Sequence, residues 1–338
     1  MLQPTTRPLA DHHDVVVLDL DGVVYIGGAA VPQAVETLGA VQATGVRLAF
    51  ITNNASRTPE EVAVHLQRIG VPARPEDVVT SAQAAARLLE GMVPPGSRVY
   101  LIGGEGLATA LRERGLEPVT TDDPAPAAVV QGYGPEMPWK QVVLGAILVR
   151  SGLPWVASNT DMTIPIPAGI GPGNGALVEL VSRFAQRQPV VAGKPSEPLF
   201  TETRLRLRTR RPLMVGDRLD TDIGGARAAQ WPSLLVMTGV TDAQTLASAP
   251  PSQRPDFISA DLRGLQAVHG VTHRDAQGWH LGGWRSHITP DGLVRLDGSG
   301  GIDDWWRCLA TAAWSHLDLT RRPADVTGCV PPPDRLSP

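Results

Sequence analysis

Two aspartates lie one residue apart near the N-terminus, where a run of apolar residues ends. Asp19 and Asp21 close the valine-rich stretch 15–20, and Gly22 follows them. Because side chains alternate along a strand, both carboxylates are expected on the same side, at the C-terminal end of that strand. Two neighbouring carboxylates repel one another unless a cation or a shared proton relieves them. The pair therefore indicates cation or acid–base chemistry, with a solvated acidic loop as the alternative.

A second group of acids follows another apolar run much later in the chain. Asp217, Asp220 and Asp222 come directly after the run 213–216 and precede a predicted helix. Hard oxygen ligands in this number suit Mg²⁺, which keeps several of its waters and bridges to the phosphate of a substrate. The group therefore indicates a magnesium site. Asp220 is interpreted as a solvated neighbour of that site.

Polar groups that suit an anion follow two further apolar stretches. Thr52 and Asn53 come after the predicted strand 47–51, and Lys194 comes after the apolar pair 190–191 and Gly193. A hydroxyl, amides and backbone N–H groups beyond a strand end form a natural cradle for an oxyanion. For Thr52 and Asn53, a polar loop before a helix is the alternative interpretation.

Lysine is rare in this chain. Of the 30 basic residues, only Lys140 and Lys194 are lysines. Arginine suits bidentate recognition, whereas lysine supplies a compact point charge that reaches a phosphate. Lys194, at a strand end beside a glycine, is therefore interpreted as required for its ammonium group. Lys140 stands next to Trp139 on a predicted helix, and we expect it at the surface.

Short apolar runs alternate with amphipathic stretches, which predicts an α/β fold with a parallel sheet and right-handed crossovers. The predicted strands are 15–20, 47–51, 98–102, 127–131, 154–157, 213–216, 234–237 and 256–258. The predicted helices are 33–44, 59–70, 82–90, 105–114, 138–150, 174–186, 198–209 and 221–229. Thr58 and Glu61 are placed to cap the second of these helices. Ligands bind at the carboxyl ends of such strands, where the polar groups stand.

Taken together, these groups resemble the four motifs of the haloacid dehalogenase superfamily. Asp19 and Asp21 match its first motif, Thr52 the second and Lys194 the third, and Asp217 and Asp222 match the fourth. The phrases LDLDGVVY, FITNNASRTPEE, AGKPSEPLF and MVGDRLDTDIGGA resemble its para-nitrophenyl phosphatase and N-acetylglucosamine-operon branch. Over its whole length, the chain is also similar to actinobacterial members that act on glycerol 3-phosphate. The resemblance implies a Rossmann-like core with an inserted cap.

The resemblance also implies a role for each motif residue. Asp19 would be the nucleophile that forms an aspartyl-phosphate, and Asp21 would be the general acid and base. Mg²⁺ would be held by the Asp19 carboxylate, the Asp21 carbonyl and Asp217, with Asp222 in support. Phosphate-binding groups would come from Thr52, the Asn53 backbone and Lys194. An acid two residues after the nucleophile separates hydrolysis from dehalogenation in this superfamily.

The spacing of the motifs places the cap. Residues 22–51 leave no room for an insertion between the first two motifs, whereas residues 53–193 separate the second from the third. We therefore predict core segments at 1–81 and 188–262, with an α/β cap at 82–187. In the cap, the loops 158–161 and 171–175 resemble the loops of this branch that close over the site. Their Asn159, Asp161 and Asn174 are candidate contacts to a small polyol, with turn and helix-cap roles as the alternative.

The C-terminal region, 263–338, differs in composition from the rest of the chain. It holds five of the eight tryptophans, and it predicts a small α+β appendage with a hairpin over 278–297 and a helix over 303–317. The tryptophans are expected to pack this appendage against the core, because aromatic side chains usually bury area. The last residues, 323–338, contain five prolines and are expected to be disordered or loosely packed.

The composition excludes several functional classes. The net charge of −4 argues against a nucleic-acid binder, and no run of about 18 apolar residues or N-terminal signal region is present. A cytoplasmic enzyme that acts on a small phosphorylated metabolite is therefore expected, with a homodimer through the cap as a possible assembly. The two cysteines lie near the C-terminus, so no disulfide framework is expected in the main body.

The expected function is Mg²⁺-dependent hydrolysis of a phosphate monoester, with glycerol 3-phosphate as the substrate that the resemblance implies. One alternative is a broad-specificity phosphatase for aryl, nucleotide or pyridoxal phosphates. Another, from a different class, is a catalytically weak protein that binds phosphoesters for regulation. The intact set of motif residues argues against the last alternative, and turnover of a phosphate ester in Mg²⁺ would exclude it.

Overall fold

The computed structural model describes residues 2–166 and 169–333, and it divides into two compact units. The first unit comprises 1–48, 69–71 and 209–338, and the second comprises 49–68 and 72–208. Strand β4 (Arg47–Thr52) begins in the first unit and ends in the second. Within the described residues, no helix has the length and apolar character that crossing a membrane requires.

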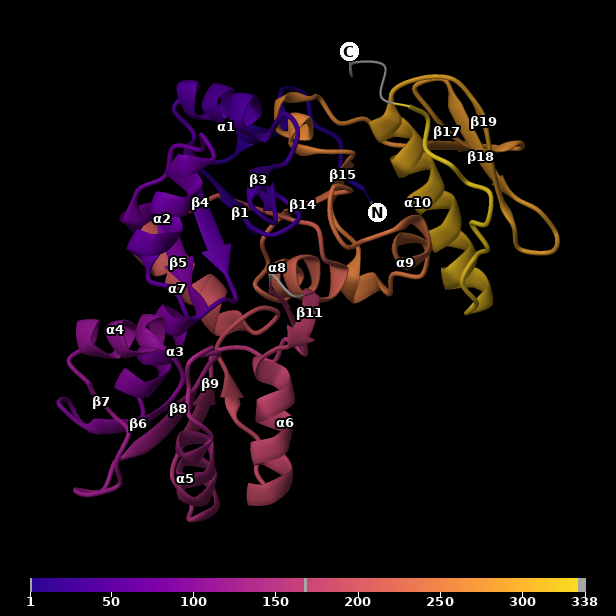
Figure 1. The fold of residues 1–338 in the computed structure, drawn as a ribbon. Coiled ribbons are helices and arrows are strands. Elements are labelled where there is room, and N and C mark those ends of the chain that lie inside the picture. The colour runs from indigo at the N-terminus through magenta and orange to yellow at the C-terminus, as the bar shows by residue number, and fades with distance from the viewer. Residues whose placement is uncertain (1, 167–168, 334–338) are drawn as a thin grey trace. The chain divides into compact units, whose positions relative to one another are not determined.

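The first unit is built on a parallel sheet (Figure 1). Its order is β15 (Phe257–Ser259), β14 (Ser233–Val236), β13 (Pro212–Gly216) and β1 (Val15–Leu18), and the start of β4 follows. Every residue of β1 is buried, as expected for a valine-rich strand that is covered on both faces. The helices of this part are α1 (Ala34–Ala43), α8 (Gly224–Ala228) and α9 (Ala243–Ala247). This sheet confirms the predicted α/β fold.

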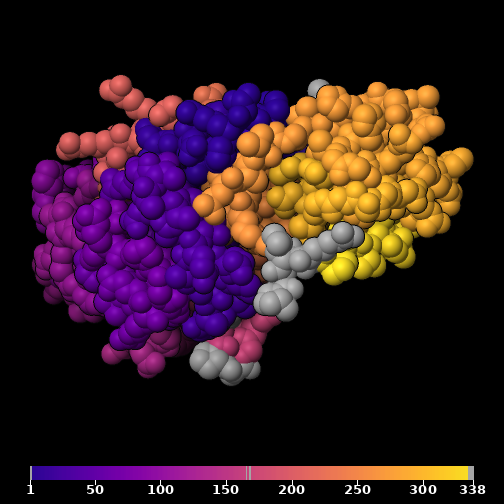
Figure 2. Space-filling view, turned by 90° about the horizontal axis from the view of Figure 1, so that it is seen from above, coloured from indigo at the N-terminus to yellow at the C-terminus, as the bar shows by residue number. Residues whose placement is uncertain are grey.

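The appendage of the first unit is an antiparallel sheet packed on a long helix (Figure 1). The sheet has the order β16 (His273–Asp275), β17 (Gly278–Leu281), β18 (Trp284–Ile288) and β19 (Val294–Gly298), and the helix is α10 (Ile302–Thr320). The segment predicted as one hairpin thus belongs to a larger sheet. In Figure 2 the orange sheet and the yellow end of the chain form one continuous mass.

The tryptophans of α10 pack as predicted. Trp305, Trp306 and Trp314 are at most 7% exposed and share one apolar core with Leu2 and with Leu235 of β14. The expectation of a loose C-terminus is wrong for residues 324–326. Val294 donates its N–H to the carbonyl of Asp325 over 2.8 Å, and Ala324 and Val326 are buried in the same core. Residues 334–338, which complete that prediction, lie outside the described residues.

The second unit contains the end of β4, paired in parallel with β5 (Val78–Thr80), and a second parallel sheet. The order of that sheet is β12 (Val190–Val191), β9 (Trp155–Ala157), β8 (Ala128–Gln131), β6 (Arg98–Ile102) and β7 (Glu117–Val119). A separate antiparallel pair joins β10 (Thr163–Ile166) to β11 (Gly169–Pro172). The helices are α2 (Pro59–Arg68), α3 (Ser81–Glu90), α4 (Glu105–Glu113), α5 (Trp139–Arg150), α6 (Asn174–Ala185) and α7 (Glu197–Leu207).

Several local predictions can be compared with these elements. Thr58 and Glu61 cap α2 reciprocally, each side chain accepting the backbone N–H of the other. The predicted helix 221–229 begins instead as a π-helical turn, Leu219–Ile223, before α8. Helix α9 and strands β5 and β7 lie in stretches for which no element was predicted. The boundaries predicted for core, cap and appendage stay predictions, because the compact units divide the chain within β4 and after residue 208.

Candidate active site

Three carboxylates converge in the first unit at the ends of β1 and β13. Asp19, Asp217 and Asp222 each offer an oxygen, and these oxygens lie within 4.8 Å of one another. Asp19 continues the strand ladder, because its N–H donates to the carbonyl of Val215 over 2.9 Å. The sequence prediction of acids gathered from distant strand ends is therefore realised for these three residues.

The carboxylate of Asp217 is held by the loop that follows β14. Its Oδ2 accepts the N–H of Val240 over 2.6 Å, and its carbonyl accepts both the N–H and the hydroxyl of Thr241. Asp217 is fully buried. The side chain thus accepts a backbone N–H from a loop that contributes no acid of its own, and the same loop binds the Asp217 carbonyl.

Two glycines allow the chain to approach Asp217 closely. Gly22 has a φ of +83°, and a Cβ there would lie 2.6 Å from Oδ2 of Asp217. A Cβ at Gly239 would also overlap this carboxylate. Thr238 donates its hydroxyl to the carbonyl of Gly22 over 2.5 Å, which joins the two glycine segments. Any larger residue at either glycine would occupy the space around the carboxylate.

Asp222 has a positioning task in addition to its place in the cluster. It is fully buried, and its Oδ2 accepts the N–H groups of Asp217 and Arg218 at 3.2 and 3.1 Å. These bonds fix the turn that carries Asp217. At Gly216 a side chain would overlap Asp222, so this close packing requires the glycine.

The motif residue Asp21 and its expected bystander Asp220 differ from the cluster in exposure. Asp21 is exposed, and its side chain is not a member of the three-carboxylate group found within the described residues. Asp220 is exposed and pairs with Arg218 at 2.8 Å, so it is a partner of that arginine rather than a member of the cluster. Desolvation raises the pKa of Asp220, but the hydrogen bonds and charge of Arg218 and the backbone N–H groups of Asp220 and Thr221 together lower it below its usual value.

The second unit gathers amide side chains around Asn53, directly after β4. The Asn53 Oδ1 accepts the N–H of Lys194 over 2.8 Å, and its Nδ2 donates to the Lys194 carbonyl over 3.0 Å. The same Nδ2 also donates to Oδ2 of Asp161 over 3.1 Å. Asn53 therefore ties the second predicted motif to the third and to a loop of the predicted cap.

Thr52 and Lys194 complete this region. Thr52 is 5% exposed, and its hydroxyl accepts the N–H of Asn54 over 3.0 Å, which tightens the turn after β4. Lys194 is 3% exposed, in contrast to Lys140, which is exposed as predicted. A Cβ at Gly193 would lie 2.5 Å from the Asn53 amide oxygen. The glycine is therefore what permits the paired bonds between Asn53 and Lys194.

The three candidate cap residues form a chain of hydrogen bonds that leads to Asn53. Asn159 donates to the Asn53 carbonyl over 2.6 Å, and Asn174 donates to the Asn159 carbonyl over 2.7 Å. Asn159 and Asn174 are buried, and Asp161 is partly exposed. These contacts give Asn159 and Asn174 a loop-positioning role. Contact of the three residues with a substrate stays a prediction.

The donor set of the carboxylate cluster fits Mg²⁺, because it consists only of oxygens and two of its three members are fully buried. Sequence reasoning missed the loop 238–241, which holds Asp217. Its signal is weak, since two threonines and a glycine after the strand now defined as β14 are also common in ordinary turns. The Asp217 carboxylate is bound by the backbone N–H of Val240, and a backbone N–H leaves no signature in residue type.

Known proteins are similar to this chain over most of its length. The family model described as haloacid dehalogenase-like hydrolase matches residues 16–117, and a second one described as HAD-hydrolase-like matches 191–265. The chain is 41% identical to the D-glycerol 3-phosphate phosphatase of Mycobacterium tuberculosis, over 95% of this chain and 92% of that protein. An acid sugar phosphatase of Staphylococcus saprophyticus is 34% identical over 75% of this chain and 99% of its own length. The structure of the Mycobacterium tuberculosis glycerol phosphate phosphatase in complex with magnesium superposes with a TM-score of 0.84, at 40% identity and over 94% of each chain.

Proposed function

The chain belongs to the haloacid dehalogenase-like hydrolases, and from that membership we propose that it hydrolyses glycerol 3-phosphate to glycerol and inorganic phosphate with Mg²⁺. The class is established, because the relatives over most of the chain are phosphatases. The observation that carries the proposal is the cluster of Asp19, Asp217 and Asp222, whose oxygens lie within 4.8 Å. The choice of glycerol 3-phosphate as the substrate rests on the Mycobacterium tuberculosis phosphatase, whose similarity to this chain extends over 95% of its residues and so into the appendage.

We assign the covalent step to Asp19. One of its carboxylate oxygens bonds to phosphorus while the bond from phosphorus to the ester oxygen breaks, which leaves an aspartyl-phosphate. Asp21 gives its proton to the departing alkoxide and then removes a proton from the water that cleaves the aspartyl-phosphate. Its exposed position suits a group that must exchange protons with solvent. At the end of the cycle Asp19 is again a free carboxylate and Asp21 is again protonated.

The remaining motif residues stabilise charge on the phosphoryl group. We propose that Thr52, the Asn53 N–H and the Lys194 ammonium face its oxygens. Asp19, Asp217 and the Asp21 carbonyl would hold Mg²⁺, with Asp222 supporting them. When bound, the ion neutralises negative charge on the phosphoryl group and the carboxylates.

The substrate can be tested with a panel of phosphate esters. Release of inorganic phosphate is measured for glycerol 3-phosphate, a sugar phosphate, an aryl phosphate and pyridoxal phosphate. We expect the highest kcat/KM for glycerol 3-phosphate. Comparable values across the panel would instead support the broad-specificity alternative, and a preference for the sugar phosphate would follow the second relative.

A homodimer through residues 82–187 also stays a proposal. It is supported by three apolar side chains on one face of α5, namely Trp139, Val143 and Ile147, which are 60, 42 and 49% exposed. Light scattering of the wild type and of Val143→Arg would test it, with a monomeric wild type as the contrary result. The cytoplasmic location expected from the sequence likewise remains a prediction.

A further inference from the structure

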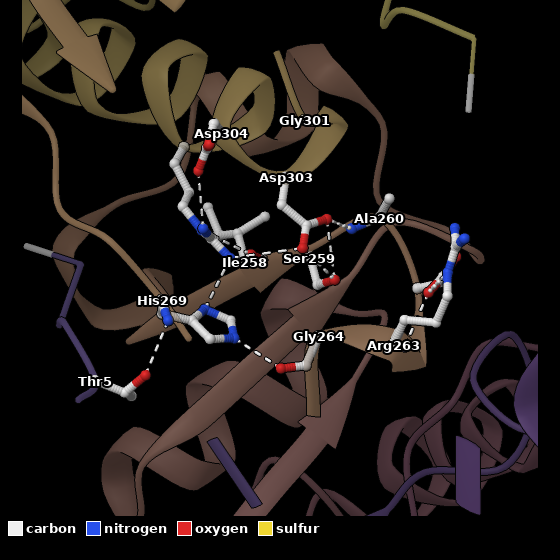
Figure 3. A network of polar contacts seen from close by, with 12 residues as sticks. Thr5, Ile258, Ser259, Ala260, Arg263, Gly264, His269, Gly301, Asp303 and Asp304 are labelled. Carbon is white, nitrogen blue, oxygen red and sulfur yellow. Dashed lines mark hydrogen bonds and ion pairs between the residues drawn. The ribbon is translucent and has the colours of Figure 1, made fainter. Parts of the chain in front are cut away.

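The appendage of the first unit has no part in the proposed chemistry, yet its helix α10 meets the sheet at the end of β15. Arg307 of α10 is 4% exposed, and its Nε donates to the carbonyl of Ile258 over 3.1 Å. Its Nη1 donates to Asp304 over 3.0 Å, and its Nη2 lies 2.9 Å from Nδ1 of His269 (Figure 3). The guanidinium is therefore satisfied on both sides and anchors the helix to the last strand of the sheet.

Asp303 extends this anchor to the residues that follow Ile258. Its carboxylate accepts the hydroxyl of Ser259 at 3.0 Å and the N–H of Ala260 at 2.8 Å, as Figure 3 shows. His269 is 1% exposed and contacts the Gly264 carbonyl through Nε2 over 2.8 Å. The carboxyl end of β15 is thus held by charged and hydrogen-bonded side chains of the appendage.

The end of β15 in turn holds the loop that fixes Asp217. The carbonyl of Ser259 accepts the N–H of Met237 over 3.1 Å, and Met237 directly precedes the loop 238–241. In that loop the N–H of Val240 donates to the Asp217 carboxylate. Hydrogen bonds at Ser259 and at Val240, joined by the backbone from Met237 to Val240, therefore connect Asp303 with Asp217.

An apolar path runs beside the polar one. Leu219 and Ile223 flank the turn that carries Asp222, and both lie in the core that also contains Trp305 and Leu309 of α10. The loop 238–241 lacks such an anchor at its centre, since the Val240 side chain is 72% exposed. The position of the Val240 N–H is consequently set by the residues on either side of it. Thr238 and Thr241 bind the carbonyls of Gly22 and Asp217, and Met237 binds the carbonyl of Ser259.

From these contacts we propose that the appendage positions the metal-binding carboxylates, with Asp303 and Arg307 as positioning residues that act through Ser259 and the loop 238–241. The inference rests on the proposed function in one respect, namely that Asp217 binds Mg²⁺. A carboxylate that is buried near two others must keep its geometry against their repulsion, and outer hydrogen-bond partners commonly set the affinity of such sites.

The experiment compares two variants of α10 in the full-length protein. Asp303→Ala removes the contacts with Ser259 and Ala260. The matched control, Asp318→Ala, removes a two-bond ion pair with Arg254 at 2.7 and 2.8 Å, from the same helix but away from the end of β15. The readout is the rise in unfolding temperature with Mg²⁺ concentration, which gives the dissociation constant for Mg²⁺ without any substrate.

We expect Asp303→Ala to raise the dissociation constant for Mg²⁺ about tenfold, with turnover at saturating Mg²⁺ restored to within about twofold of the wild type. Asp318→Ala should lower the unfolding temperature while leaving Mg²⁺ affinity unchanged. Equal Mg²⁺ affinity in both variants and the wild type would overturn the proposal.

A milder variant covers the case in which Asp303→Ala fails to fold. Ser259→Ala removes one hydrogen bond of the path, and it should raise the dissociation constant about two- to threefold, since a typical hydrogen bond contributes little net stability. An unchanged constant in this variant would contradict the proposal. Failure of the proposed function is recognised separately, as a wild type that binds Mg²⁺ but releases no phosphate from any ester.

Discussion

The carboxylate cluster of the first unit and the amide network of the second unit are held together in opposite ways. In the cluster, Asp217 and Asp222 are fully buried beside Asp19, and the carboxylates of both accept backbone N–H groups. In the network, Asn53 uses both ends of its amide on one partner, Lys194. The first arrangement accumulates negative charge, whereas the second satisfies its polar groups internally.

The two regions should therefore respond differently to substitution, cations and acid. A cluster of like charges is stabilised by a cation and relieved by neutralisation. Apart from the Asp161 carboxylate, the bonds around Asn53 are made by uncharged amide and backbone groups, so a cation or a proton has less charge to neutralise there. This network loses stability whenever a partner is removed and a buried polar group remains unsatisfied. The following predictions test that contrast.

Asp19→Asn should have the largest effect, because it removes the proposed nucleophile from the cluster. We expect kcat to fall by at least about a thousandfold, as is typical when a nucleophile is replaced. The measurement is phosphate release from glycerol 3-phosphate at saturating Mg²⁺. Full activity in this variant would refute the assignment of Asp19.

Lys194→Arg tests the network in the same assay. The side chain is 3% exposed, so a broader guanidinium cannot be accommodated without displacing its neighbours. We expect kcat/KM to fall by about 100- to 1,000-fold. Lys140→Arg is the matched control at an exposed position and should stay within about twofold of the wild type.

Mg²⁺ should stabilise the cluster and not the network. At a concentration of 100 times its dissociation constant, the ion should add about 2.7 kcal/mol to the free energy of unfolding. Asp217→Asn should abolish this gain and, without the ion, should unfold at a higher temperature than the wild type because repulsion is relieved. Asn53→Ala should keep the gain while lowering the unfolding temperature. Thermal unfolding with and without Mg²⁺ distinguishes these outcomes.

Acid should weaken the first unit through the buried His269. Burial lowers the pKa of His269 from 6.5 to about 4, so the unfolded chain takes up a proton below pH 6.5 while the folded chain does not. The contribution of neutral His269 to the free energy of unfolding is complete above pH 6.5. It is lost as the pH falls towards 4, at about 1.4 kcal/mol for each pH unit. The stability gap between the wild type and His269→Gln, from urea unfolding at pH 7 and pH 5, should therefore shrink. At exposed His273 the same substitution should leave the gap unchanged.

The sequence predicted the parts of the site whose chemistry resides in side chains. Asp19, Asp217 and Asp222 could be assigned because the ends of parallel strands meet at one edge of a sheet. The roles of Asn159 and Asn174 could not, since an amide that binds another loop has the same residue type as one that binds a ligand. The order at 324–326 was missed because it comes from pairing with Val294 and burial in the tryptophan core, not from local composition.

The division of the chain has a consequence for its synthesis. The second unit, residues 49–68 and 72–208, is complete once residue 208 has been made, whereas β1 must wait for β13 to pair Val15 with Pro212. The core that Leu2 shares with Leu235 and Trp305 is complete only when α10 has been made. Domains generally fold as they leave the ribosome, and distant pairings form late. The nascent chain therefore carries a finished second unit while its amino-terminal strand is still unpaired with β13, and the last helix closes the first unit.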